Sequence, residues 1–269
     1  MANPHVTQHR IVRVTEGGAT TLDDHVVVER ALEMRVGGQS LAVTLRTPGR
    51  DRELTLGFLA SEGVIHAPAE VVELAESKSD CADEPDHVDV TLRPGTPLDW
   101  TRFERNFAST AACGLCGRAH LDSLRAGLVP VADGFRVEQR ALLEWPSHLR
   151  ESQEAFALTG GIHAAAFAWS PGPPELLRED VGRHNAVDKV IGAMFERGRM
   201  PIGSGLLWVS GRAGAEIVLK AARAGIPVLA SVGAPSSLAI ELAEAARMTL
   251  IGFLREGRMN VYCGAERLC

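Results

Sequence analysis

The chain has 269 residues, 45% of them hydrophobic and 23% charged, with 27 glycines and 14 prolines. This length and composition predict one or two folded domains and exclude disordered, collagen-like and coiled-coil chains. The formal net charge of -6 excludes a generally basic surface, so we expect no nucleic acid and no membrane among the partners. The N-terminus lacks the apolar core of a signal peptide, and no apolar stretch approaches the roughly 18 residues of a membrane span. We therefore expect a cytoplasmic protein.

The first half of the chain is predicted to be rich in strands. Hydrophobic residues alternate with polar ones on both sides of Gly37 and Gly38, which predicts a hairpin with a glycine turn. A short helix, an acidic solvated loop and another alternating strand follow at residues 53–59, 79–86 and 88–92. These elements predict a β-rich N-terminal lobe, to which we assign residues 1–104.

The second half has the pattern of alternating strands and helices. Short apolar strands are predicted at residues 206–210, 226–232 and 249–253. The segments between them are predicted to be helices, the second of which is capped by Ser236 or Ser237. Such a β-α-β-α-β unit has parallel strands, so the loops that follow the three strands should meet at one edge of the sheet.

An amphipathic helix is predicted before this unit, at residues 187–195, with Asn185 as its N-cap. On this interpretation Asp188 complements the helix dipole and Lys189 is a solvated helix residue.

The loops after the three strands combine glycine, serine and arginine at residues 210–214, 233–237 and 254–258. Glycine allows close approach of a ligand to the backbone, and Arg212, Arg255 and Arg258 add permanent cations, so the loops suit a phosphate or pyrophosphate. The alternative is that the glycines and serines are turn and cap residues and the arginines are solvated. No Walker or GxGxxG fingerprint occurs, which argues against a nucleoside triphosphatase or a dinucleotide dehydrogenase.

Cys113 and Cys116 form a CxxC pair in front of a predicted helix. The free amides and positive dipole end of a helix N-terminus favour thiolate, so nucleophilic sulfur chemistry is one interpretation. A structural zinc site is another, with His120 and either Cys81 or Cys263 as further ligands. The spacing alone leaves zinc binding, dithiol redox chemistry and sulfur or acyl carriage open.

Two further segments combine glycine with polar side chains. One ends at His163, and in the other Arg183 and His184 lie where an amphipathic helix is predicted to start. An anion or a general acid is well placed at such a position. The alternative for each histidine is a structural hydrogen-bond donor.

Six segments carry a resemblance to a known family: ACGLCG at 112–117, TGGIH at 159–163, EDVGRHNAVDKVIG at 179–192, SGRAGAEIVLK at 210–220, APSSLAIELA at 234–243 and GFLREGRMNVY at 252–262. In these segments the chain resembles the formate dehydrogenase accessory sulfurtransferases, the FdhD/NarQ family. The matching segments run in order from about residue 100 to the end of the chain. Residues 213–215 are smaller here than is usual in the family.

The resemblance implies a cytidine-deaminase-like α/β core, which we assign to residues 105–269, and a homodimer. It implies a sulfurtransferase that receives sulfur from a cysteine desulfurase as a cysteine persulfide. The sulfur then passes to Mo-bis(molybdopterin guanine dinucleotide) before that cofactor enters apo formate dehydrogenase. A deaminase is not expected, because the zinc-binding His-x-Glu is missing: His163 is followed by two alanines.

The resemblance also assigns the site residues. Cys113 carries the persulfide and Cys116 assists or resolves, with no metal. The strand-end loops suit the substrate's guanine dinucleotide end, for which GDP or GTP is a partial analogue. From the chemistry of their residues we assign that end to Phe253, Leu254, Arg255, Glu256, Gly257 and Arg258. We expect amides in the 109–117 loop to exchange quickly without ligand, and Arg183 and His184 to line the path to the phosphates. Two alternatives are a zinc-stabilised nucleotide-binding module and a cofactor-holding chaperone, neither with a catalytic cysteine.

Overall fold

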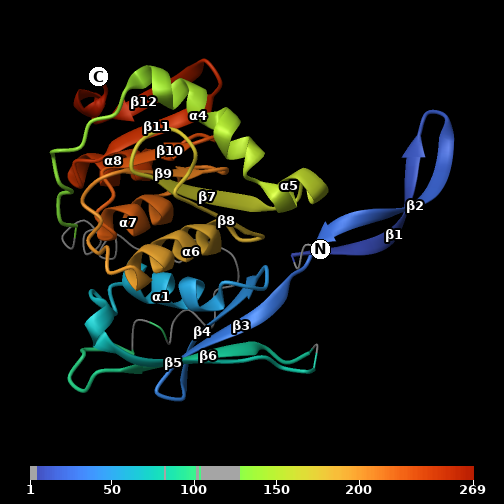
Figure 1. The fold of residues 1–269 in the computed structure, drawn as a ribbon, viewed down its shortest axis with the longest axis horizontal. Coiled ribbons are helices and arrows are strands. Elements are labelled where there is room, and N and C mark those ends of the chain that lie inside the picture. The colour runs from blue at the N-terminus through green and yellow to red at the C-terminus, as the bar shows by residue number, and fades with distance from the viewer. Residues whose placement is uncertain (1–4, 82, 101–102, 104–127) are drawn as a thin grey trace.

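The computed structural model describes residues 5–81, 83–100, 103 and 128–269. In these ranges the chain forms sheets of two, four and six strands with helices packed on them (Figure 1). This is a mixed α/β fold with a β-rich N-terminal part, as the sequence predicts. None of the helices in these ranges is long and apolar enough to cross a membrane. The predicted boundary at residues 104 and 105 lies outside the described residues, and the likeness to cytidine deaminases stays a prediction.

The elements follow the chain in two groups. The N-terminal part contains β1 (Val6–Thr15), β2 (Gly18–Val27), β3 (Arg30–Val36), β4 (Gln39–Arg46), α1 (Asp51–Ser61), the 3-10 helix η1 (Pro68–Glu70), β5 (Val71–Ser77) and β6 (Asp86–Leu92). The second part contains α4 (Gln139–Glu151), α5 (Glu154–Thr159), β7 (His163–Ala168), β8 (Leu176–Asp180), α6 (Arg183–Glu196), β9 (Leu206–Val209), α7 (Ala215–Arg223), β10 (Val228–Ser231), α8 (Ser237–Ala245), β11 (Thr249–Arg255), β12 (Arg258–Cys263) and the 3-10 helix η3 (Ala265–Arg267).

The N-terminal part consists of an arm and a sheet. β1 and β2 pair antiparallel and project from the body (Figure 1), and the four-stranded sheet has the order β4-β3-β6-β5. The predicted hairpin of β3 and β4 is confirmed. Gly37 and Gly38 in its turn have φ values of 59° and 80°, which side-chain-bearing residues rarely adopt.

The acidic loop predicted at residues 79–86 is solvent-exposed over most of its described residues, as predicted. Its last residue differs: Asp86, the first residue of β6, is buried and accepts a hydrogen bond of 2.6 Å from Arg46. Arg46 is also buried and donates two further hydrogen bonds to Asp51 at the start of α1. A buried guanidinium requires such partners, so Asp86 neutralises part of the charge of Arg46 in the interior of the protein.

The six-stranded sheet has the order β12-β11-β10-β9-β7-β8. β9, β10 and β11 are parallel, which confirms the predicted β-α-β-α-β unit. β7 runs antiparallel to both β9 and β8. The start of β7 therefore lies beside the ends of β8 and β9. We call the edge formed by the ends of the three parallel strands, with the start of β7, the carboxyl edge.

Helices α1, α6 and α7 lie between the two larger sheets, and α4 covers the opposite face of the six-stranded sheet (Figure 1). α1 and α6 cross in close contact at two glycines. A Cβ atom on Gly57 would lie 1.8 Å from the carbonyl oxygen of Asp188, and one on Gly192 would lie 1.8 Å from that of Glu53. Only glycine fits at this crossing, which joins the N-terminal part to the second part.

α6 begins earlier than predicted, with Gly182 as its N-cap. Asn185 is not the cap. Its side-chain amide is buried in the first turn and donates to the carbonyl oxygen of Leu45 at 2.8 Å and to Asp180 at 3.0 Å. The asparagine therefore ties α6 to β4 and β8.

The predictions for the next two charged residues of α6 are also wrong. Lys189 is buried, and its Nζ lies 2.6 Å from Asp180. Asp188 is buried too, with both carboxylate oxygens 2.9 Å from Nζ of Lys220 on α7. The reason is that α6 is covered by α1 on one side and by the six-stranded sheet on the other, so it has little solvated surface.

Candidate functional site

The carboxyl edge brings the predicted strand-end loops together. The backbone N–H of Gly233 donates to the carbonyl oxygen of Gly211 at 2.9 Å, and that of Phe253 donates to the carbonyl oxygen of Gly233 at 3.1 Å. These two bonds place the ends of β9, β10 and β11 in one row. Ser236 accepts a hydrogen bond from the amide of Ala239 and caps α8, as predicted.

The segment assigned to the guanine dinucleotide, residues 253–258, comprises the last three residues of β11, the turn at Glu256 and Gly257, and the first residue of β12. Phe253 is 40% exposed and has a positive φ of 51°, so the backbone turns its ring toward the surface. Leu254 is fully buried, which leaves only its backbone for a ligand. Arg255 donates to the carbonyl oxygens of Val232 at 2.7 Å and Leu254 at 3.2 Å. Arg255, Glu256, Gly257 and Arg258 are all exposed.

His163 and Ser210 meet at the carboxyl edge. The Ser210 hydroxyl oxygen accepts a hydrogen bond of 2.9 Å from the amide of Ala164 and lies 3.4 Å from Nδ1 of His163. The hydroxyl hydrogen is then free to donate to Nδ1, so we assign the ring proton of His163 to Nε2. Burial, together with the positive charges of Arg183 and His184, lowers the pKa of His163. The ring is therefore a neutral donor at pH 7.

His184 pairs with Glu216 at the start of α7. Nε2 of His184 lies 2.8 Å from a carboxylate oxygen of Glu216, and this hydrogen bond holds the pKa of that carboxyl below its usual value. Arg183, the first residue of α6, is exposed beside this pair. The structure thus brings His163, Arg183 and His184 to one place. The sequence analysis names His163 in one segment and Arg183 and His184 in another, and it missed Glu216.

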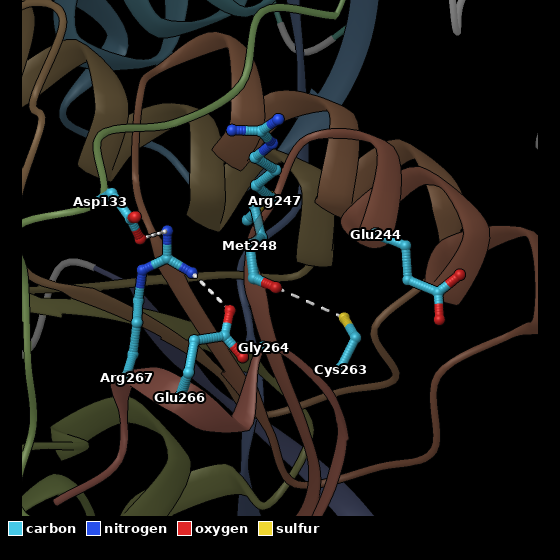
Figure 2. A pocket seen from close by; sticks show the side chains of 8 residues that line it. All are labelled: Asp133, Glu244, Arg247, Met248, Cys263, Gly264, Glu266 and Arg267. Atoms are coloured by element: carbon cyan, nitrogen blue, oxygen red, sulfur yellow. Dashed lines mark hydrogen bonds and ion pairs between the residues drawn. The ribbon is translucent and has the colours of Figure 1, made fainter.

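A surface pocket of about 450 Å³ lies at the opposite edge of the sheet, where β11 begins and β12 ends (Figure 2). Figure 2 shows the guanidinium of Arg267 between Asp133 and Glu266, at nitrogen–oxygen distances of 3.4 and 3.8 Å. Side chains of both charges line this pocket. None of the residues assigned to the guanine dinucleotide lies in it.

Cys263 lines the same pocket, half-buried, and its thiol donates to the carbonyl oxygen of Met248 at 3.4 Å. Burial raises the pKa of this thiol to about 11, so thiolate is scarce at pH 7 and the residue is a poor nucleophile. We predict that Cys263→Ser leaves sulfur transfer nearly intact. The initial rate of formate dehydrogenase activation measures this, and a large loss of rate would show that Cys263 takes part.

In the part of the chain that the structure describes, no group of three or more His, Cys, Asp or Glu side chains is placed to hold a metal ion. Cys81 and Cys269 are exposed free thiols. Cys113, Cys116 and His120 lie outside the described residues, as does the 109–117 loop. The choice between a persulfide and a zinc site at the CxxC pair therefore depends on experiment.

Comparison with known proteins defines the class of the chain. Its fold is similar to the crystal structure of a protein from Desulfotalea psychrophila described as a formate dehydrogenase accessory protein, with a TM-score of 0.78 and 25% identity over 99% of this chain and all of that one. Residues 27–269 match the FdhD/NarQ family. The chain belongs to the FdhD/NarQ family.

Two named relatives match this chain over nearly the full length of both proteins. The sulfur carrier protein FdhD of Streptomyces coelicolor is 45% identical, over 98% of this chain and 96% of that protein. The protein of the same name from Nocardia farcinica is 46% identical, over 100% of this chain and 96% of that protein. The family expected from the six sequence segments is confirmed.

Proposed function

We propose that the chain is a sulfurtransferase, a sulfur carrier required for formate dehydrogenase activity. It takes sulfur from a cysteine desulfurase and delivers it to Mo-bis(molybdopterin guanine dinucleotide) before this substrate enters apo formate dehydrogenase. Membership of the FdhD/NarQ family carries the proposal, because relatives that match the chain end to end are sulfur carrier proteins. We further propose that it works in the cytoplasm, as a homodimer, on a cytidine-deaminase-like core.

Cys113 is the proposed sulfur acceptor. Its thiolate attacks the outer sulfur of the desulfurase persulfide, a new S–S bond forms on Cys113, and the desulfurase cysteine leaves as a thiolate. Cys116 then attacks the Cys113 sulfur, which forms a disulfide between them and releases the outer sulfur as hydrosulfide for the substrate. A dithiol reductant returns the pair to thiols for the next cycle. Release of the outer sulfur as hydrosulfide takes two electrons, which the two cysteines supply when they form their disulfide. This step therefore needs no other reductant.

The guanine dinucleotide end of the substrate is proposed to bind at residues 253–258. The exposed ring of Phe253 suits stacking on a base, and Arg258 is exposed on the same turn. We predict that Arg258→Glu lowers the affinity for GDP more than tenfold. The change removes a charge-assisted contact of about 1.5–3 kcal/mol and adds repulsion. Isothermal titration with GDP measures it, and unchanged affinity in both Arg255→Glu and Arg258→Glu would move the site elsewhere.

Reconstitution with purified components tests the proposed function. The chain, a cysteine desulfurase, cysteine, the molybdenum substrate and apo formate dehydrogenase are mixed, and formate oxidation is followed. We expect activation that requires all five components. Equal activation without cysteine and desulfurase would favour the cofactor-holding chaperone instead. Stoichiometric zinc in the purified chain, together with full activity of a Cys113 variant, would favour the zinc-stabilised binding module.

A further inference from the structure

Arg267 lines the surface pocket of about 450 Å³ in Figure 2, and its guanidinium lacks part of its hydrogen bonding. The side chain is 1% exposed. Its Nη2 donates to the carbonyl oxygen of Ala132 at 3.3 Å and to Asp133 at 3.4 Å. Within the described residues Nε and Nη1 have no acceptor. A buried charge with open donors costs free energy, so these donors indicate a missing acceptor.

Two carboxylates stand beside this guanidinium without satisfying it. Figure 2 shows Asp133 on one side and Glu266 on the other, at nitrogen–oxygen distances of 3.4 and 3.8 Å. Charge-assisted hydrogen bonds of this kind are about 2.7–2.9 Å long, so both contacts are loose. The two side chains are 84% and 66% exposed. Either can therefore turn toward solvent and leave the guanidinium open to a ligand.

A second arginine without a partner lines the same pocket. Arg247 is exposed, and within the described residues no hydrogen bond or ion pair engages its guanidinium (Figure 2). It follows the C-cap of α8 and has a φ of 53°, a left-handed conformation that helix ends usually give to glycine. An arginine here carries strain that glycine would avoid, which indicates a function for its side chain.

The charges around the pocket limit what can bind there. The two arginines share it with three carboxylates, those of Asp133, Glu244 and Glu266. These carboxylates repel a dianion such as phosphate, and the arginines repel a simple cation. A metal ion is not favoured, because in the described part of the chain no group of three His, Cys, Asp or Glu side chains is placed to hold one. A ligand with one carboxylate and one ammonium group suits both signs of charge.

We propose that this pocket binds a free α-amino acid. The ligand's carboxylate accepts hydrogen bonds from Arg267 and Arg247, and its ammonium group donates to Glu266. An α-amino acid carries both groups on one carbon, which matches the adjacent guanidinium and carboxylate of the loose Arg267–Glu266 pair. The pocket lies at the opposite edge of the six-stranded sheet from residues 253–258. The inference therefore goes beyond the proposed function and does not depend on it.

L-alanine is the probe that tests this site. It is what remains of cysteine when the sulfur atom is removed, so a working desulfurase produces it. L-alanine is titrated into the full chain and its binding is followed by ligand-observed NMR. N-acetyl-L-alanine, which lacks the ammonium group, and L-alaninamide, which lacks the carboxylate, are titrated in the same way. We expect each analogue to bind about tenfold more weakly than L-alanine, because each loses one charge-assisted contact.

Arg247→Gly tests the carboxylate end of the site. We expect the affinity for L-alanine to fall about tenfold with the loss of the guanidinium. The urea midpoint should not fall, because glycine adopts a positive φ without strain. This variant thus separates a binding role from a structural one. The matched control is Arg140→Gln on α4, where an exposed arginine pairs with Glu144 outside the pocket. It should leave the affinity unchanged.

Glu266→Gln tests the ammonium end. We expect the affinity for L-alanine to fall about fivefold, since the exposed carboxylate that holds the ammonium group is neutralised. The affinity for N-acetyl-L-alanine should not fall, because that compound has no ammonium group to hold. Urea unfolding verifies that the variant is folded.

The proposal is overturned by either of two results. The first is a wild-type chain that binds L-alanine no better than its two analogues, or does not bind it. The second is binding of L-alanine that Arg247→Gly and Glu266→Gln both leave unchanged. Sulfur transfer is measured separately, by the activation of formate dehydrogenase, so failure of this site and failure of the proposed function are distinguished.

Discussion

Cys113→Ala abolishes the activation of formate dehydrogenase while leaving the binding of GDP unchanged. This is the expected result because the proposed persulfide needs a thiolate at that position, whereas the proposed contacts of the guanine dinucleotide lie in other segments of the chain. The measurement is formate oxidation after reconstitution, beside calorimetric titration of GDP into the same variant. A variant that loses both properties would indicate a structural role for Cys113.

Cys116→Ala distinguishes the two cysteines. We expect this variant to acquire sulfur but to release it slowly, since the proposed resolving thiol is missing. Cys81→Ser and Cys269→Ser are the controls, because both replace exposed free thiols outside the CxxC pair. If Cys113→Ala still acquires the sulfur and Cys116→Ala does not, the order of the two cysteines is reversed.

Lys220→Ala lowers the free energy of unfolding by about 3–5 kcal/mol, because it leaves the carboxylate of Asp188 buried without its counterion. Nζ of Lys220 lies 2.9 Å from both oxygens of Asp188 and 2.8 Å from Oγ of Ser61 on α1. Burial alone would lower the pKa of Lys220, but the carboxylates of Asp188 and Glu62 outweigh it and raise this pKa. The charged pair therefore holds α7, α6 and α1 together. Urea unfolding followed by circular dichroism measures the change.

A surface pair gives the matched control for this prediction. Arg197 and Glu175 are 2.7 Å apart, with side chains about half exposed, so Arg197→Ala should cost about 0–1 kcal/mol. The double change of Asp188→Leu with Lys220→Met replaces both buried charges by apolar groups and should recover most of the loss. Equal, small effects of Lys220→Ala and Arg197→Ala would contradict a central role for the buried pair.

Much of the fold could be predicted because its signals are local. The alternation around Gly37 and Gly38 specifies a hairpin, and the short apolar strands with intervening helices specify the parallel part of the six-stranded sheet. Buried charges could not be predicted in this way. Lys189 and Asp188 look like surface residues of a helix until α1, from the other part of the chain, covers that helix. Their burial depends on tertiary packing, which no local pattern records.

The residues of the candidate site are predicted in separate segments of the chain, and the sequence does not show that these segments meet. The reason is related. The Arg183–His184 helix start and the loop after β9 were each recognised as suited to an anion. Their meeting with His163 depends on β7 running antiparallel to β9, which places the first residue of β7 at the carboxyl edge. Strand direction is set by long-range pairing. The partnership of His184 with Glu216 was missed for the same reason.

Mass spectrometry of the chain after incubation with a cysteine desulfurase and cysteine tests the central claim most directly. The account predicts one added sulfur atom on the peptide that contains Cys113, removed by a reducing agent and absent from Cys113→Ala. No added sulfur on that peptide, with desulfurase turnover shown in the same reaction, would contradict the account.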